Sequence, residues 1–369
     1  MPEARPSPRD MRRHQMVATV IVVIVSVAIG ALGRNEDTGR DAGAKRRGGH
    51  LYQQMCAVCH GASGAGYKAD QAPAITHPEF LASASDYFLR SAIMNGRAGT
   101  TMSAWSVERG SPLVRADTDA IVAYLRGWDR KPHPTLDERP VNGDPTRGAE
   151  IYARECARCH GGGGLGGPYV NIGNAQLLSS ATNGFLRHAI RNGRAGTAMP
   201  GFSVGLGDAA IEDVVALLRS WEASQQMPKA APAAPPPIPL GPVPLNPRGP
   251  EPLGFRPHPG TTSVDVVKAE LDRHAKLAVL DARAPSDYTY EHIAGAVSVP
   301  FYDVEPYVAA LPRNAWIVCY CSCPHAESGQ LAQALVGKGF KRVTVLDEGL
   351  GFWKRKGFPT ASGTAPSKP

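Results

Sequence analysis

Two copies of one pentapeptide carry the residues best suited to cofactor chemistry in this chain. Cys56-Ala57-Val58-Cys59-His60 recurs one hundred residues later as Cys156-Ala157-Arg158-Cys159-His160. Two thiols one helical turn apart can form thioethers with both vinyl groups of a haem, and the adjacent histidine can bind the iron. A zinc knuckle or a redox-active cysteine pair with an incidental histidine is the alternative, and the second copy argues against it. The spacing therefore predicts two covalently bound haem c groups, attached at Cys56, Cys59, Cys156 and Cys159, with His60 and His160 as iron ligands.

A second repeated stretch offers a distal ligand for each iron. Residues 87–105 align with residues 184–202, and twelve of the nineteen aligned positions are identical, which is enough to fix the correspondence. Met102 and Met199 occupy the same position in this alignment. A thioether opposite an imidazole is the ligand pair that raises the potential of a haem. We therefore predict Met102 and Met199 as the distal iron ligands.

Other side chains could compete for that role. Met94 stands opposite Arg191 in the alignment, so it cannot be a ligand shared by both copies. His77 and His188 are weaker rivals as distal ligands. A methionine buried in an apolar core is the structural alternative for either predicted ligand.

Helical patterns bracket each pentapeptide. The opening segments are residues 51–55 and 151–155, and the closing segments, 119–126 and 212–219, have apolar residues at helical spacing. Gly148 precedes the second opening segment, where we expect it to act as a flexible entry. Each copy is thus predicted to be a small all-helical unit.

These features together resemble a known family. The units at residues 45–131 and 140–224 look like class I cytochrome c domains, and the pair resembles a tandem dihaem cytochrome. The resemblance implies a carrier of electrons, with iron alternating between Fe(III) and Fe(II), and redox partner proteins such as another cytochrome, an oxidase or a reductase.

Three cysteines remain after the haem sites, and they lie together at Cys319, Cys321 and Cys323. Residues 316–320 read as a buried strand, and a helix is predicted from Ser328 to Lys338. Cys321 therefore falls between a strand and the N-terminus of the next helix, where backbone amides favour a thiolate and can hold an anionic persulfide or sulfur oxyanion. Further strands are predicted at 277–281 and 342–346, which makes this part a parallel α/β unit.

The order of motifs in this part resembles a rhodanese-like domain. The motifs are residues 280–283, 290–297, 318–321 and 346–353, within a predicted domain at 261–362. The resemblance implies that Cys321 is the catalytic, sulfur-accepting cysteine. The chain would then be a sulfurtransferase or a sulfur-compound oxidoreductase acting on small sulfur compounds such as thiosulfate or sulfane sulfur.

The loop after Cys321 departs from the usual family pattern. Glu327 brings a negative charge where many relatives have a cation, so the resemblance does not define the substrate preference. Cys323 could resolve a persulfide on Cys321 or form a strained disulfide with it. Cys319 is expected to be a core residue of the strand. A rhodanese-like fold without activity, used for sulfur sensing or docking, is the alternative function.

The N-terminal region predicts export. Residues 1–15 are basic, and residues 16–33 contain an almost wholly apolar run from Met16 to Leu32. By the positive-inside rule this run keeps the N-terminus in the cytoplasm and sends the rest to the periplasmic side of the bacterial cytoplasmic membrane. We expect a retained membrane anchor, with a cleaved signal peptide as the alternative.

The remaining composition separates the units and excludes one class of partner. Residues 225–260 are a proline-rich linker, with thirteen prolines between Pro228 and Pro259. The net charge of +7 is concentrated in the first fifty residues, which hold nine Lys or Arg against five Asp or Glu. The later units therefore lack the clustered charge of a nucleic-acid surface. The predicted fold class is multidomain, with two all-α cytochrome c domains followed by an α/β domain with a parallel sheet.

Overall fold

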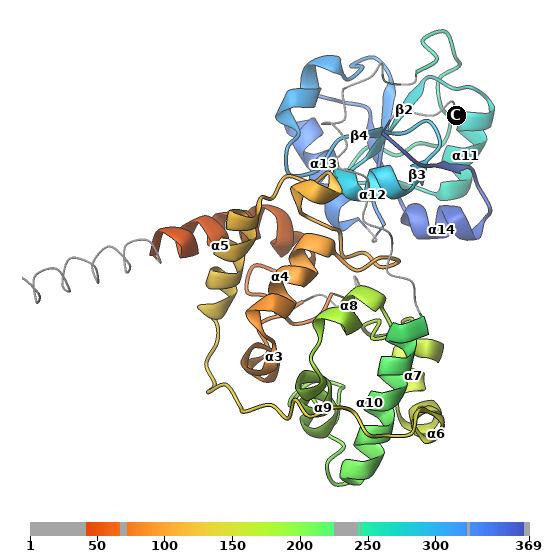
Figure 1. Cartoon of the computed structure of the whole chain (residues 1–369). Helices are drawn as coiled ribbons and strands as arrows, with labels where there is room; N and C mark the ends of the chain where they lie inside the picture. The colour runs from red at the N-terminus through yellow and green to blue at the C-terminus, as the bar shows by residue number, and fades with distance from the viewer. Residues whose placement is uncertain (1–41, 67–71, 225–242, 244, 323–324, 365–369) are drawn as a thin grey trace, which may run out of the picture.

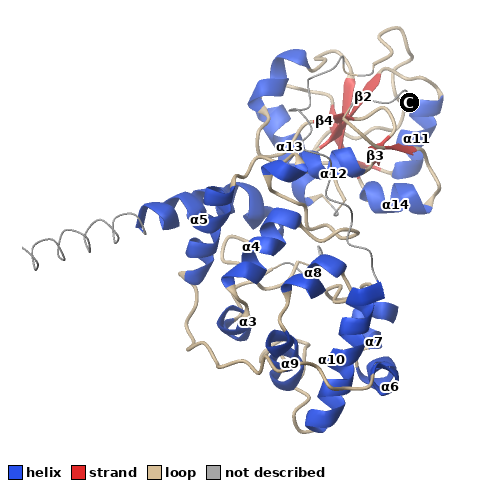
Figure 2. Ribbon diagram, viewed as in Figure 1, coloured by secondary structure: helices blue, strands red, loops and turns tan. Residues whose placement is uncertain are grey.

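A computed structural model of the chain describes residues 42–66, 72–224, 243, 245–322 and 325–364. Helices occupy the N-terminal half, and the strands lie in a C-terminal α/β domain, as Figure 2 shows. The predicted fold class is therefore confirmed. The apolar run from Met16 to Leu32, most of the proline-rich linker and Cys323 lie outside the described residues. Within the described part, no helix has the length and apolar character needed to cross a membrane.

Each repeat is a set of short helices in the same order (Figure 1). In the first repeat, residues 42–51 are helical and continue without a break into the next elements. These are η1 (Tyr52–Cys56), α2 (Ala57–His60), α3 (Pro78–Ser83), α4 (Asp86–Asn95), η2 (Val107–Arg109) and α5 (Arg115–Arg126). The second repeat contains α6 (Pro145–Glu155), α7 (Ala157–His160), η3 (Gly162–Gly164), α8 (Ala175–Ser180), α9 (Asn183–Asn192) and α10 (Gly207–Ser224).

The opening and closing helices of each repeat cross at a glycine. A Cβ atom on Gly48 would lie 1.9 Å from the carbonyl oxygen of Ala120, and one on Gly148 would lie 2.1 Å from that of Asp213. The backbones can approach this closely only because a side chain is missing. The expectation that Gly148 is a flexible entry is wrong, because it lies inside α6 and packs against α10.

Equivalent arginines connect the closing helix of each repeat to the C-terminal end of α3 or α8. Arg126 donates hydrogen bonds to the carbonyl oxygens of Leu81 and Ala84, at 2.6 and 2.5 Å. In the second repeat Arg219 donates to the carbonyl oxygens of Leu178 and Ala181, at 2.7 and 2.6 Å.. These bonds satisfy carbonyl groups at the ends of α3 and α8.

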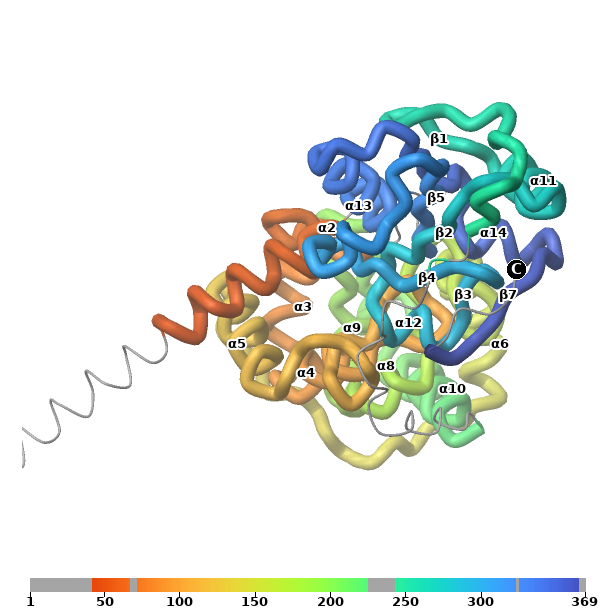
Figure 3. Tube along the Cα trace, turned by 90° about the horizontal axis from the view of Figure 1, so that it is seen from above, coloured from red at the N-terminus to blue at the C-terminus, as the bar shows by residue number. Residues whose placement is uncertain are grey.

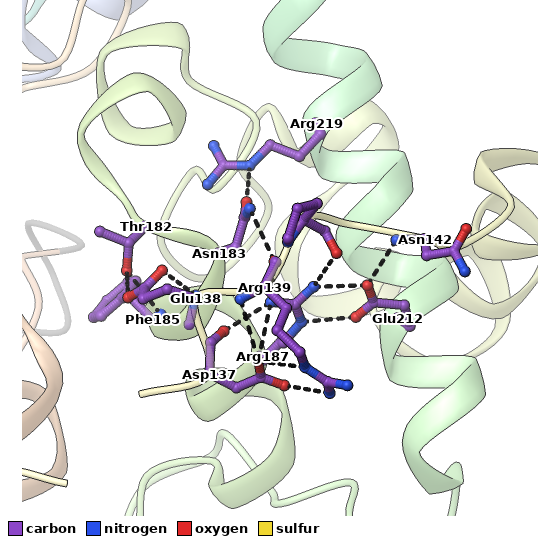
Figure 4. Close-up of polar contacts among 12 residues, drawn as sticks. Asp137, Glu138, Arg139, Asn142, Thr182, Asn183, Phe185, Arg187, Glu212 and Arg219 are labelled. Carbon is purple, nitrogen blue, oxygen red and sulfur yellow. Dashed lines mark hydrogen bonds and ion pairs between the residues drawn. The ribbon is translucent and has the colours of Figure 1, made fainter. Parts of the chain in front are cut away.

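The segment between the repeats is held by Arg187 (Figure 4). This buried guanidinium donates to the carbonyl oxygens of Asp137 and Arg139, at 2.7 and 2.8 Å. It also forms a bidentate ion pair with the carboxylate of Glu212, with both bonds at 2.7 Å. The connecting chain is thus fixed to α9 and α10 of the second repeat.

The α/β domain contains a five-stranded sheet in the order β1-β6-β5-β2-β4, whose pairings are all parallel. Its strands are β1 (Thr261–Thr262), β2 (Leu277–Asp281), β4 (Val297–Ser298), β5 (Trp316–Tyr320) and β6 (Val343–Leu346). Strands β3 (His292–Ile293) and β7 (Thr360–Ala361) form a separate antiparallel pair. The helical elements are α11 (Val264–Asp272), α12 (Pro285–Tyr290), η4 (Glu305–Ala310), α13 (Ala326–Gly337) and α14 (Gly349–Arg355).

Candidate functional site

The histidine of each pentapeptide is oriented through one ring nitrogen. Nδ1 of His60 lies 3.2 Å from the carbonyl oxygen of Pro73, and Nδ1 of His160 lies 2.8 Å from that of Val170. A hydrogen bond at Nδ1 fixes the tautomer in which Nε2 is free to bind a metal. In both histidines Nε2 is thus the nitrogen left for a metal, which fits haem c, and their role as iron ligands stays a prediction.

A partly buried arginine in each repeat also fits an acidic cofactor. Arg97 and Arg194 correspond in the two repeats, and burial lowers the pKa of each to about 10. Nη1 of Arg194 is buried without a hydrogen-bond partner. A cation desolvated in this way favours an anionic group beside it. Haem carries carboxylates that could fill this role.

In each repeat the partly buried arginine also begins the turn that carries the predicted distal methionine. The amide of Arg97 donates to the carbonyl oxygen of Met102 at 2.9 Å. The hydroxyl of Thr100 donates to the carbonyl oxygen of Arg97 and accepts from the amide of Met102. Thr197 builds the same turn before Met199. The two methionines thus share one local geometry, and their role as iron ligands stays a prediction.

The rival ligand His77 lies where the two repeats meet. As N-cap of α3, it approaches the carbonyl oxygen of Ala195 in the second repeat, at 2.9 Å from Nε2. The equivalent N-cap of α8, Asn174, donates to the carbonyl oxygen of Ala98 in the first repeat at 2.7 Å. This reciprocal contact gives the pair of repeats an approximate two-fold relationship.

His188 lies in the same interface. Its Nε2 is 3.5 Å from the Glu79 carboxylate of the first repeat. Beside it, the rings of Phe88 and Phe185, which correspond in the two repeats, are 4.9 Å apart. Both rival histidines therefore have contacts that connect the repeats.

Cys321 follows β5 and precedes α13, as predicted. It is 1% exposed, and its sulfur lies 3.3 Å from the hydroxyl oxygen of Ser328 in the first turn of α13. Cys319 is fully buried in β5, where burial raises the pKa of its thiol. The structure thus distinguishes a cysteine beside a helix N-terminus from an inert cysteine of the core.

An arginine that the sequence analysis did not single out reaches the Cys321 loop. Arg283 forms a buried ion pair with Asp281, with bonds of 2.9 and 2.6 Å, and donates to the hydroxyl of Ser322 at 3.1 Å. The hydroxyl of Tyr320 donates to the same carboxylate at 2.6 Å. The cation is therefore held next to the residue that follows Cys321. The sequence signal for it was the Leu-Asp-Ala-Arg motif at residues 280–283.

Two buried carboxyl groups, those of Glu327 and Asp287, interact electrostatically near Cys321. Burial raises the pKa of Glu327 well above its usual value, and the charges of Cys321 and Asp287 raise it further. Burial likewise raises the pKa of Asp287, and the positive charge of Arg283 opposes this rise. No sequence pattern indicated Asp287, because its position depends on a contact with a distant part of the chain.

Comparison with protein families separates the same parts of the chain. Residues 43–125 and 143–218 match the family described as cytochrome c oxidase, cbb3-type, subunit III. Residues 263–356 match the family described as rhodanese-like domain. Neither match overlaps the other.

Individual relatives divide in the same way. The subunit FixP of a cbb3-type cytochrome c oxidase from Bradyrhizobium sp. is 27% identical over 48% of this chain, and the alignment spans 61% of that relative, less than two thirds of its length. The thiosulfate sulfurtransferase GlpE of Pseudomonas entomophila is 38% identical over 24% of this chain and 80% of its own. The solution structure of a rhodanese-like domain from Anabaena sp. is 28% identical and covers 29% of this chain and 80% of its own, with a TM-score of 0.27.

Proposed function

We propose that this chain, whose α/β domain belongs to the rhodanese-like domains and whose two repeats match the cbb3-type subunit III cytochromes, is an exported dihaem carrier of electrons that also handles sulfane sulfur. Haem c, when bound, supplies reversible one-electron exchange at iron. In this proposal Cys56, Cys59, Cys156 and Cys159 attach the haems. The iron ligands are His60, Met102, His160 and Met199.

The observation that carries the sulfur part is the environment of Cys321. A thiolate at this position can accept a hydrogen bond from the Ser328 hydroxyl and lies near the N-terminus of α13. The next residue, Ser322, accepts a hydrogen bond from Arg283. In the proposed loading step the thiolate attacks the outer sulfur of a donor, the donor bond to that sulfur breaks, and an S–S bond forms on Cys321. This transfer is redox-neutral.

Electrons are released only when the sulfur is oxidised afterwards. A persulfide anion on Cys321 and an acceptor thiolate can join through a new S–S bond with the loss of two electrons. Each of the two haems would accept one of these electrons. We propose this coupling as the reason for the fusion. The alternative is an electron-transfer cytochrome whose α/β domain only senses sulfur or docks a partner, and the burial of Cys321 favours it.

The location and partners follow from the same proposal. The haem units would lie on the periplasmic side of the cytoplasmic membrane, held by Met16–Leu32. An oxidase or another cytochrome would exchange electrons with them, since the relatives of the repeats are oxidase subunits by name.

The deciding experiment is anaerobic mixing of the oxidised holoprotein with thiosulfate, sulfide or polysulfide while haem absorbance is followed. We expect reduction by at least one donor in the wild type and a loss of most of the rate in Cys321→Ser. Cys319→Ser is the matched control, because Cys319 is sealed in the core. Equal rates in wild type and Cys321→Ser would support the docking alternative.

A further inference from the structure

The α/β domain packs against the first repeat, although the second repeat precedes it in the sequence (Figures 1 and 3). The hydroxyl of Ser103 donates to the carboxylate of Asp287 at 2.5 Å, and that of Ser286 donates to the carbonyl oxygen of Ala104 at 2.8 Å. The rings of Trp105 and Tyr302 are 5.4 Å apart. Residues about 180 positions apart therefore form one contact surface. We call it the docking surface, consisting of Gln54 and Ser103–Trp105 on one side and Ser286, Asp287 and Tyr302 on the other.

The docking surface uses positions at which the two repeats differ. Met102 and Met199 are both conserved between the repeats, but Ser-Ala-Trp follows the first and Pro-Gly-Phe follows the second. Proline has no hydroxyl, so Pro200 cannot donate the bond that Ser103 donates. Gln54 donates to the carbonyl oxygen of Tyr302 at 3.2 Å, and Arg154 takes its place in the second repeat.

The residues that differ between the repeats after the two methionines also differ in burial. Ser103 and Trp105 are buried at 4% and 5% exposure, whereas Pro200 is exposed and Phe202 is only partly buried. Two repeats with the same local turn thus differ in what covers the residues after the methionine. The α/β domain supplies that cover in the first repeat alone.

Two members of the docking surface, Asp287 and Tyr302, also interact electrostatically with Glu327, which lies in the first turn of α13 after Cys321. The charge of Asp287 acts on both Arg283 and Glu327, and that of Glu327 acts on Tyr302. In addition, α2, which carries Cys59 and His60, contacts α13, which follows Cys321 (Figure 3). The docking surface therefore begins directly after Met102 and interacts electrostatically with Arg283 and Glu327 near Cys321, while α2 and α13 touch beside it.

We propose that the docking surface couples the Met102 segment to Cys321, so that the first haem site responds to sulfur on Cys321 and the second does not. The first repeat is then the fixed partner of the α/β domain, and the second repeat is left open for an external redox protein. The response to sulfur rests on the proposed function, whereas the docking itself does not.

The docking is tested in the full-length holoprotein by alkylating Cys321 with iodoacetamide and mapping the labelled peptides. Ser103→Ala removes one buried hydrogen bond, so we expect labelling of Cys321 to become about fivefold faster. Asp287→Asn, made from the other side of the surface, should have a similar effect. Pro200→Ala is the matched control and should leave the rate unchanged. Unchanged labelling in both Ser103→Ala and Asp287→Asn would overturn the docking.

The coupling is tested by loading Cys321 with polysulfide, confirming the added sulfur by mass, and recording the sulfur–iron absorption of the oxidised protein. Loading should alter the band that Met102→Ala abolishes and leave the band that Met199→Ala abolishes. Ser103→Ala should weaken this response. Loading without any change in either band would overturn the coupling and leave the proposed sulfur chemistry intact. Failure of Cys321 to load would instead refute the proposed function, while the alkylation result still decides the docking.

Discussion

The hydroxyl oxygen of Ser328 lies 3.3 Å from the sulfur of Cys321, inside the first turn of α13. This hydroxyl can donate a hydrogen bond to the thiolate and to a persulfide anion formed on it. A bond to a charged acceptor contributes more than one between neutral groups. We therefore expect Ser328 to influence the reactivity of Cys321 directly.

We expect Ser328→Ala to slow sulfur loading of Cys321 by about tenfold, as the loss of a hydrogen bond to a charged group would. The measurement is the rate at which the Cys321 peptide gains one sulfur from polysulfide. Ser263→Ala is the matched control, because Ser263 is the N-cap of α11 in the same domain and its hydroxyl accepts a hydrogen bond from the backbone amide of Val266. Equal loading rates for all three proteins would exclude a role for the Ser328 hydroxyl.

Covalent haem in both repeats predicts a simple stoichiometry. The denatured wild-type protein should retain two haems, and Cys56→Ala with Cys59→Ala should retain one. Replacing Cys156 and Cys159 in the same way should also leave one, because each pentapeptide forms its own thioethers. Mass spectrometry of the denatured protein gives the count. A wild-type protein without attached haem would refute both sites.

If a methionine thioether binds the iron, replacing Met199 and replacing Met94 should have different effects on the absorption spectrum. Met199→Ala should remove a sulfur–iron charge-transfer band and lower the potential of one haem, since the thioether stabilises Fe(II). Met94→Ala is the control, because Arg191 replaces Met94 in the other repeat. Absorption spectra during a redox titration test this. An unchanged band in Met199→Ala would point to histidine as the distal ligand.

The strands of the α/β domain could be predicted closely, and the docking surface could not. Residues 277–281 and 316–320 are short apolar runs buried on both faces, so their bounds agree with β2 and β5. Helix α13 begins at Ala326, two residues before the predicted start. His325 precedes it with a positive φ of 71°, which the sequence pattern did not indicate.

The part of the site that escaped prediction depends on contacts between distant residues. Ser103 and Asp287 are separated by 184 positions, and nothing in either neighbourhood indicates the other. Gly148 shows a related limit, because its pattern suggested flexibility when its role is close contact between helices. Local motifs predicted which residues carry the chemistry, and the packing decides which of them act together.

The Arg187 network predicts a pH-dependent attachment of the segment between the repeats. Hydrogen bonds from Arg187 lower the pKa of Glu212, so the attachment is complete above the ordinary pKa of a glutamate and is lost as the pH falls through the lowered value. Arg187→Met should make amide exchange in residues 137–142 about tenfold faster at pH 7. The loss of protection on acidification, measured relative to the intrinsic exchange rate at each pH, should then disappear. Exchange measured by mass spectrometry provides the test.

Arg139→Met is the matched control for that experiment. Its guanidinium pairs with Asp137, as Figure 4 shows, and the side chain of Arg139 is largely exposed. Exposed ion pairs of this kind contribute little to stability. Amide exchange of residues 137–142 in Arg139→Met should therefore follow that of the wild type. Equal exchange in Arg187→Met and Arg139→Met would show that the segment is held by other contacts.

Glu327 predicts how the sulfur site discriminates among donors. Burial raises its pKa, and Cys321 and Asp287 raise it further, while Arg283 opposes them and Asp281 adds to the rise. As the pH increases through this raised pKa, the carboxyl group becomes an anion next to Cys321. Thiosulfate is a dianion and should then be repelled, whereas a neutral donor should not.

We therefore expect Glu327→Gln to load Cys321 from thiosulfate faster than the wild type, by about fivefold at the alkaline end of the range, because removing one nearby charge of like sign is a change of about 1 kcal/mol. The ratio of the two rates should rise with pH, and using the ratio cancels the ionisation of Cys321 common to both proteins. Glu305→Gln is the control, since this carboxylate is exposed and pairs with Lys338. A ratio that does not change with pH would mean that Glu327 stays protonated throughout, and its effect on donor choice would then have to come from shape alone.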